Sequence, residues 1–485
     1  MRLSAFSLST CCFCLAALVR PSSASFYDNP EVEVRPETEI PLEELKAKWD
    51  FDWSFSGIST FGHLKHVKCL TTPYEPFDIG ILGAPFDTAV SYRPGKHLSS
   101  SKSLHLLFCP EQAILILITH FKYTFPSPPP YLSLLSSSPF LLFSSYAKQY
   151  PPQGARFGPR AIRAASARQT SFRGFNHRAA VNPYQSWAQI LDCGDIPVTP
   201  FDNALALHQM TTAYTELISR RPLSFSNPPS HTHPKLISLG GDHSIALAAL
   251  RALSKIHDRP IAVLHFDAHL DTWHPGAYPS VWSTTPTQAD FTHGTMFWVA
   301  SEEGLIANGS SVHAGLRTRL SGNEWGDYDN DERQGFLRIE ADDIDAVGVS
   351  GIIELIMDTM GTETPVYLSV DIDVIDPGLA PGTGTPEPGG WTTRELIAIL
   401  RGIEGLNVVG ADVVEVAPAY DGVGESTALA GAQVAYEILT SMVKRGLKDR
   451  GEEVILTKPG SQKILNKAKE KAKAKAKANA KKDEL

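Results

Sequence analysis

The sequence contains little cysteine. Six Cys occur among 485 residues, and three of them fall within the first 24 residues. The other three, Cys69, Cys109 and Cys193, are scattered along the chain. This spacing predicts neither a disulfide framework nor a zinc site.

Other features that the sequence lacks exclude whole classes of function. No Gly-x-Gly-x-x-Gly motif follows the apolar stretch Phe77–Asp87, so a Rossmann cofactor site is not expected. The apolar pieces 113–118 and 131–143 are too short, or too broken by Ser and Pro, to span a bilayer. The formal net charge is -9, but residues 463–485 carry +6, which leaves -15 on the rest of the chain. This acidic body disfavours nucleic acid as a partner.

Both ends of the chain carry sorting signals. Met1–Ala24 has a basic residue, an apolar stretch and small residues before the expected cleavage point, which predicts a signal peptide. The last four residues, Lys482–Leu485, form a retention signal of the endoplasmic reticulum. With the sequon at Asn308, these signals predict a protein of the endoplasmic reticulum lumen or a secreted protein. Residues 25–75 are expected to form an N-terminal arm, and residues 451–485 a solvated Lys/Ala-rich tail.

The catalytic domain is expected to cover residues 76–450, with an atypical insertion at residues 96–154. The insertion is rich in Ser, Leu, Phe and Pro and has neither strand nor helix periodicity. Such a long structureless loop is improbable within a compact domain. It is either a lineage-specific surface insertion or a translated intron. We favour the intron, because the flanking segments would join smoothly without it.

The rest of the domain alternates strand-like and helix-like segments. This alternation predicts an α/β fold with three α/β/α layers and a parallel sheet covered on both faces. The units that carry the pattern are Phe77–Asp87, Pro234–Ile256, Arg259–Asp271, Ser311–Gly315, Thr364–Asp373 with Thr392–Ile403, and Asn407–Glu415 with Thr427–Lys444.

One stretch, Pro260–Trp273, turns from an apolar run into three metal-binding side chain types at alternate positions. In an extended strand, alternate side chains share a face, so Asp267, His269 and Asp271 should project together. A calcium loop is the competing interpretation, but no Gly follows Asp271.

Two further apolar strands end in the same kinds of side chain. One strand and its Gly-Gly turn lead to His243, and another ends in Asp371 and Asp373. Carboxyl ends of parallel strands meet at one edge, so four carboxylates and two imidazoles should converge there. Unneutralised like charges would be costly, which predicts two divalent cations. Oxygen and imidazole ligands without thiolate favour manganese, with zinc, iron and magnesium harder to exclude.

Several motifs together resemble the ureohydrolase (arginase/agmatinase) family, and most closely its fungal-type agmatinases. The resemblance covers about residues 77–95 and 155–444. The matching segments are Gly83–Asp87, Arg156–Arg163, Gly241–Ser244, Asp267–Asp271, His293–Phe297, Ser369–Pro377 and Glu415–Asp421.

The resemblance implies an arginase-like fold, a homo-oligomer (trimer or hexamer), and two Mn2+ ions per subunit bridged by Asp267 and Asp371. A hydroxide between the ions would attack the central carbon of a guanidinium. Asp271 would orient this hydroxide and pass its proton to the leaving amine. Glu415 would pair with the guanidinium, and His293 would shuttle protons. The implied ligands are His243, Asp267, His269, Asp271, Asp371 and Asp373. Without the resemblance, Glu415 is an acid at a strand end and His293 a plain loop histidine.

The substrate is expected to be a small cationic guanidine. Thr272 and Trp273 differ from the polar continuation by which arginases bind an amino-acid head group. Agmatine, cleaved to urea and putrescine, therefore fits best. Another amidinohydrolase activity, such as guanidinobutyrase, remains open, as does an inactive metal-binding isoform because of the 96–154 insertion.

Overall fold

A computed structural model describes residues 59–90, 154–224, 233–277 and 291–452 of the chain. The predicted signal peptide, most of the arm, nearly all of the insertion and the Lys/Ala-rich tail lie outside these residues.

The centre of the described part is an eight-stranded sheet with the order β2-β1-β3-β8-β7-β4-β5-β6. All seven neighbouring pairs are parallel, as the alternating pattern predicted. The edge strands β2 and β6 are not among the strands predicted from the sequence. The strands are β1 (Ile79–Ala84), β2 (Ile190–Asp195), β3 (Lys235–Gly240), β4 (Ala262–Phe266), β5 (Ser311–Leu316), β6 (Phe336–Glu340), β7 (Pro365–Asp371) and β8 (Asn407–Val414).

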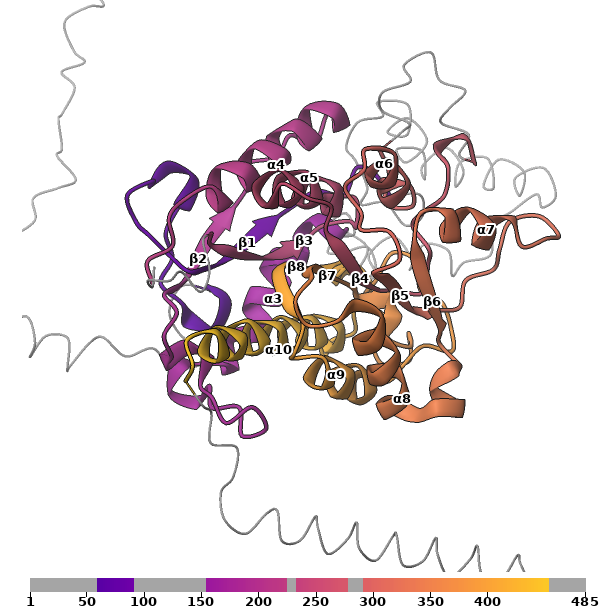
Figure 1. Ribbon diagram of the computed structural model, residues 1–485. Helices are drawn as coiled ribbons and strands as arrows, with labels where there is room; N and C mark the ends of the chain where they lie inside the picture. Colours follow the sequence, from indigo (N-terminus) through magenta and orange to yellow (C-terminus); the bar gives the residue numbers. More distant parts are fainter. Residues whose placement is uncertain (1–58, 91–153, 225–232, 278–290, 453–485) are drawn as a thin grey trace, which may run out of the picture. The chain divides into compact units, whose positions relative to one another are not determined.

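Helices cover both faces of this sheet, which confirms the three-layer α/β prediction (Figure 1). One layer contains α4 (Asn203–Ile218), α5 (Ile245–His257) and α6 (Met296–Glu302). The other contains α3 (Gly158–Ala165), α8 (Asp343–Met360), α9 (Thr393–Gly402) and α10 (Ser426–Asp449). The short helix α7 (Gly326–Arg333) precedes the edge strand β6.

Two hydrophobic cores lie on the two faces of the sheet. In β1, Ile79 and Ile81 belong to one core, whereas Leu82 and Ala84 belong to the other. This division follows from the strand geometry, because successive side chains point to opposite faces. Strands buried on both faces need apolar residues at nearly every position, which explains their unbroken apolar runs.

The end of the predicted arm packs against the edge of the sheet. His66 forms a parallel bridge with Asp192 of β2, and the backbone N–H of Phe61 donates to the Asp192 carboxylate at 2.8 Å. Cys69 forms a disulfide with Cys193, across 124 residues of sequence. The fold brings these two buried residues together, and the spacing of the cysteines in the sequence did not predict this single disulfide.

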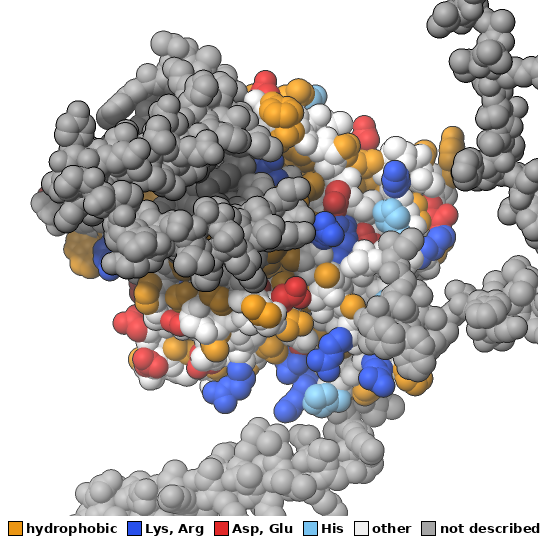
Figure 2. All heavy atoms as spheres, turned by 180° about the vertical axis from the view of Figure 1, so that it is seen from behind, with side chains coloured by type: hydrophobic (Ala, Val, Ile, Leu, Met, Phe, Trp, Pro, Cys, Tyr) orange, Lys and Arg blue, Asp and Glu red, His pale blue; other side chains and the backbone are white. Residues whose placement is uncertain are grey.

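The face turned away in Figure 1 carries hydrophobic side chains mixed with charged ones (Figure 2). Lys and Arg side chains group toward its lower border, and acidic side chains lie among the hydrophobic ones. Among the described residues, no helix is long and apolar enough to cross a membrane.

Candidate functional site

The four strands that lead to the candidate site residues are neighbours in the sheet. Strands β3, β8, β7 and β4 are consecutive in the middle of the sheet. All run in the same direction, so their carboxyl ends share one edge, where open α/β sheets hold their ligands. Beyond these ends lie His243, Glu415, Asp373 and Asp267, while Asp371 is the last residue of β7.

A tight turn after β3 presents His243 to this edge. The N–H of Gly241 donates to Ala84 O at 2.9 Å, and the N–H of Asp242 donates to Phe86 O at 2.7 Å. A Cβ at position 241 would lie 1.7 Å from Phe86 O, so only glycine fits there. The turn leads directly into α5, and His243 is fully buried.

Three carboxylates surround one nitrogen of His243. Its Nδ1 lies 3.0 Å from Asp267 Oδ2, 3.1 Å from Asp271 Oδ2 and 3.4 Å from Asp371 Oδ2. These four residues come from three strand ends. The structure thus brings them together around a single small volume.

A second group forms on the other side of Asp267. His269 Nδ1 lies 3.1 Å from Asp267 Oδ1 and 3.1 Å from Asp373 Oδ2. The two oxygens of Asp267 therefore face the two groups separately, as a bridging carboxylate would. Asp371 faces the first group through Oδ2, and its Oδ1 accepts from the N–H of Asp373 at 2.8 Å.

Two of these acids have an unusual backbone conformation. Asp271 has φ of 56° and Glu415 has φ of 61°, both in the left-handed region. Non-glycine residues rarely adopt this conformation and are strained in it. Both carboxylates reach His243, Asp271 at Nδ1 and Glu415 at the backbone N–H.

The electrostatics of the cluster reflect its burial and its excess of acid. Burial alone would lower the pKa of His243, but hydrogen bonds with Asp267 and Asp271 raise it well above the usual range. The pKa of His269 is raised in the same way by Asp373 and Asp267. Burial and the neighbouring carboxylates raise the pKa of Asp371 far above normal. Without another source of positive charge, the cluster must hold protons to balance its carboxylates.

The donor atoms suit divalent cations. His243, Asp267 and Asp271 form one set with His265, and Asp267, His269 and Asp373 form another, each with its ligand atoms within 4.8 Å. Neighbouring ligands in an octahedral shell at about 2.1 Å lie about 3 Å apart, which is close to the separations above. Carboxylate and imidazole donors without thiolate are those of a hard or borderline metal.

Glu415 and His293 lie beside this cluster. Glu415 Oε1 accepts from the N–H of His243 at 3.0 Å and lies 3.0 Å from His293 Nδ1. Burial would lower the pKa of His293, but the hydrogen bond and charge of Glu415 raise it to about 9. Glu415 Oε2 is buried and has no hydrogen-bond partner within the described part of the chain. A buried carboxylate oxygen without a partner is costly, so this atom is poised for a donor from outside the chain.

Polar residues that the sequence did not single out also contact the cluster. His243 Nε2 lies 2.7 Å from Ser369 Oγ, and Ser369 donates to Asp412 Oδ1 at 2.7 Å. His265 Nε2 lies 2.9 Å from Asp267 Oδ2. Ser369 and His265 are each two positions before a predicted ligand, in strands that are otherwise apolar. This spacing was the available signal, because residues two apart share a face.

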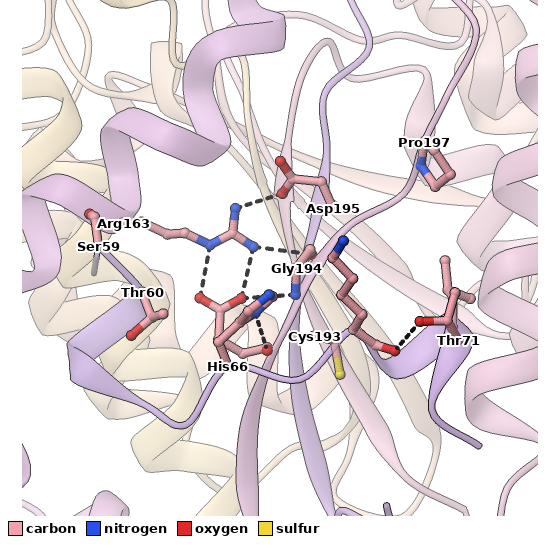
Figure 3. Close-up of a pocket in the computed structure, with 12 residues that line it drawn as sticks. Ser59, Thr60, His66, Thr71, Arg163, Cys193, Gly194, Asp195 and Pro197 are labelled. Carbon is pink, nitrogen blue, oxygen red and sulfur yellow. Dashed lines mark hydrogen bonds and ion pairs between the residues drawn. The ribbon is translucent and has the colours of Figure 1, made fainter. Parts of the chain in front are cut away.

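A separate cavity of about 530 Å³ lies beside β2 (Figure 3). Inside it, the Arg163 guanidinium pairs with both oxygens of Asp192 and with Asp195 Oδ1. None of the predicted site residues lines this cavity. Four of the five N–H groups of the Arg163 guanidinium already donate to Asp192, Asp195 and Gly194 O. Its lining residues are Ser59, Thr60, His66, Lys68, Leu70, Thr71, Arg163, Asp192, Cys193, Gly194, Asp195 and Pro197.

Comparisons with known proteins agree with this geometry. A model described as the Arginase family matches residues 143–440. "Putative agmatinase 1" of Schizosaccharomyces pombe is 42% identical over 398 residues, covering 81% of this chain and 84% of that protein. "Agmatinase" of Photorhabdus laumondii is 39% identical, covering 59% of this chain and 80% of its own length. Among solved structures, the proclavaminate amidino hydrolase of Streptomyces clavuligerus aligns with a TM-score of 0.59 at 30% identity. That alignment covers 81% of this chain and all of the other.

Proposed function

Since the chain belongs to the arginase family, we propose that it hydrolyses agmatine to urea and putrescine with the help of two Mn2+ ions. Its relatives show that the chain is an agmatinase-like ureohydrolase, because both relatives described above carry agmatinase names. The finer proposal concerns the substrate, the metal and the roles of the site residues.

The proposed ligands divide between two cation positions that would share Asp267 and Asp371. His243 and Asp271 would complete one position, and His269 and Asp373 the other. When bound, the two cations neutralise the buried carboxylates and activate water as a nucleophile at neutral pH. Asp271 projects into the first group, where its carboxylate can accept a proton from the attacking water and deliver it to the departing amine.

Glu415 Oε2 is the observation that carries the substrate assignment. It is a buried anionic acceptor next to the cluster, without a partner among the described residues. A guanidinium is planar, cationic and rich in N–H donors, so it supplies what this oxygen lacks. His293, which contacts the other oxygen of Glu415, would shuttle protons for the reaction.

The environment of Thr272 favours a substrate without an amino-acid head group. Thr272 is buried, and its hydroxyl donates to Asp331 Oδ1 at 2.8 Å. The N–H of Trp273 donates to Gly294 O at 3.1 Å. The hydrogen of the Thr272 hydroxyl is thus already donated inside the protein and is not available to a substrate carboxylate. Agmatine has no carboxylate, whereas arginine and 4-guanidinobutyrate both have one.

A substrate panel tests this proposal. The Mn2+-loaded protein should release urea from agmatine with a much higher kcat/KM than from arginine or 4-guanidinobutyrate, and putrescine should appear in equal amount. A preference for 4-guanidinobutyrate would contradict the agmatine assignment but keep the ureohydrolase chemistry. Absence of urea from every guanidine, with metal bound, would support the inactive-isoform alternative.

Two described features support the proposal that the protein enters the secretory pathway. Cys69 and Cys193 form a disulfide, which persists mainly in oxidising compartments. Asn308 of the sequon is exposed in a turn, where a glycan can attach without disturbing the core. In a eukaryotic host, the protein should begin near Ser25, stay in the endoplasmic reticulum and lose mass on enzymatic deglycosylation.

The variant Asn308→Gln is the control for that experiment, since it removes the Asn of the sequon but keeps an uncharged amide side chain. It should show no mass change on deglycosylation and the same fractionation as the parent. An unglycosylated parent with Met1 intact, recovered from the cytosol, would overturn the assignment to this pathway.

A further inference from the structure

A buried chain of polar side chains leads from the candidate ligand Asp267 to the neighbouring strand and on to α7. His265 Nε2 lies 2.9 Å from Asp267 Oδ2, and His265 Nδ1 lies 2.7 Å from His313 Nδ1. His313 Nε2 then lies 2.9 Å from Asp331 Oδ1. His265, His313 and Asp331 are all fully buried. We call these three residues the histidine chain.

Strand pairing brings the two histidines together. His265 of β4 and His313 of β5 are direct partners in the parallel register. The His313 ring also stacks on Phe336, with ring centroids 3.9 Å apart and planes inclined by 17°. Hydrogen bonding and ring packing therefore both hold His313, and an experiment has to separate them.

The far end of the histidine chain is firmly anchored. Asp331 accepts from Thr272 Oγ1 at 2.8 Å and from Arg338 Nη1 at 3.3 Å, in addition to its contact with His313. Burial would raise the pKa of Asp331, but the charge and hydrogen bond of His313 lower it. Asp331 thus acts as an ionised, fixed acceptor.

The hydrogen-bond roles along the chain follow from its two ends. A carboxylate oxygen of Asp267 faces His265 Nε2 and one of Asp331 faces His313 Nε2, so each oxygen can accept a hydrogen bond from its neighbouring ring. His313 Nδ1 can donate to His265 Nδ1, which leaves the hydrogen of His265 on Nε2. In this arrangement His313 occupies the second nitrogen of His265 and leaves its Nε2–H directed at Asp267.

From these contacts we propose that His313 is a positioning residue for the metal centre, which acts through His265 to orient the bridging carboxylate of Asp267. The described contacts of His265 reach Asp267 and the His243 ring, whereas its other nitrogen is held by His313. Groups that orient a metal ligand by hydrogen bonding raise metal affinity. The inference rests on the proposed metal site.

Two substitutions at His313 separate hydrogen bonding from packing. His313→Asn removes the ring but places an amide nitrogen near the position of Nδ1, so a donor to His265 remains. His313→Phe keeps a ring to stack on Phe336 but has no donor. The Mn2+ dissociation constant, measured by competition with a chelator, should rise about 10- to 100-fold for His313→Phe and stay near the parent value for His313→Asn.

The melting temperature of the metal-free protein is the second readout. His313→Asn should lower it more than His313→Phe does, since Asn loses the ring contacts. His257→Phe, on α5 and outside the histidine chain, controls for the loss of a histidine as such. If His313→Phe binds Mn2+ like the parent while His313→Asn binds weakly, His313 serves packing alone and the inference fails.

A second pair of variants keeps the test decisive if His313→Phe does not fold. His265→Gln places an amide donor near the position of Nε2, whereas His265→Leu has no donor. The Gln variant should retain Mn2+ affinity and the Leu variant should lose it. Equal affinity of both variants and the parent would overturn the inference. If the parent itself binds no Mn2+, the proposed function fails, and this outcome is distinct from equal binding by all the variants.

Discussion

Replacing Glu415 by Gln changes one buried oxygen into an NH2 group. In the parent, Oε1 accepts from the N–H of His243 and contacts His293, and the amide oxygen of Gln can take over this place. The NH2 group then lies where Oε2 lay, in a position without a partner among the described residues. It would face the N–H groups of a bound guanidinium, donor against donor. The substitution should therefore impair substrate binding and leave the metal ligands in place.

The size of the effect follows from the bond that is lost. A hydrogen bond between charged partners contributes about 1.5–3 kcal/mol, so kcat/KM for agmatine should fall about 10- to 150-fold. The pKa of His293 should fall, since the hydrogen bond and charge of Glu415 are the main causes that raise it.

The assay is urea release from agmatine across a substrate series, with Mn2+ content measured on the same samples. Glu404→Gln is the matched control, because Glu404 pairs with Lys444 away from the cluster. Its kcat/KM should equal that of the parent. If Glu415→Gln turns over agmatine as the parent does with full metal content, Glu415 does not bind the guanidinium and the substrate argument is wrong.

Three further outcomes are expected. Asp271→Asn should abolish urea release, because the Asn amide cannot accept a proton. The fold should be retained, because Asn tolerates the left-handed backbone at this position. Residual activity above a hundredth of the parent would exclude a proton-transfer role for Asp271. Mn2+ affinity should rise with pH around neutrality, because His243 and His269 have raised pKa values and must lose a proton before they can bind the metal. The expected rise is about tenfold per pH unit for each histidinium that loses its proton. Calorimetric titration that shows constant affinity and no proton release at several pH values would contradict this. Replacing Cys69 and Cys193 with Ser should lower the melting temperature. The chain-entropy model limits the lost free energy of unfolding to about 5 kcal/mol for a 124-residue separation. An unchanged melting temperature in non-reducing buffer would show that the disulfide does not stabilise the fold.

Local sequence was enough to predict which acids and histidines gather at one edge of the sheet. An apolar strand followed by acids indicates a site at the carboxyl edge of a parallel sheet. Asp267, Asp271 and Asp373 could therefore be identified without a structure. The extended backbone that we expected beyond the strand is wrong, because β4 ends at Phe266, Asp271 has φ of 56° and Asp373 lies in a short 3-10 helix. The parallel α/β architecture was also predictable, since buried strands need unbroken apolar runs and helices to cover them. The left-handed backbone of Asp271 and Glu415, by contrast, has no signature in the sequence.

Tertiary structure alone decided which distant residues meet. The edge strands β2 and β6 escaped prediction because they lack the pattern of a strand buried on both faces: Asp195 and Leu337 are exposed. The pairing of Cys69 with Cys193 depends on how the arm folds onto β2, which the spacing of cysteines does not encode. Likewise, His265 and His313 are 48 residues apart and become neighbours only because β4 pairs with β5. Periodicity in the sequence predicts the face of a strand on which a side chain lies. The residues that the side chain contacts depend on which strands pair in the whole sheet.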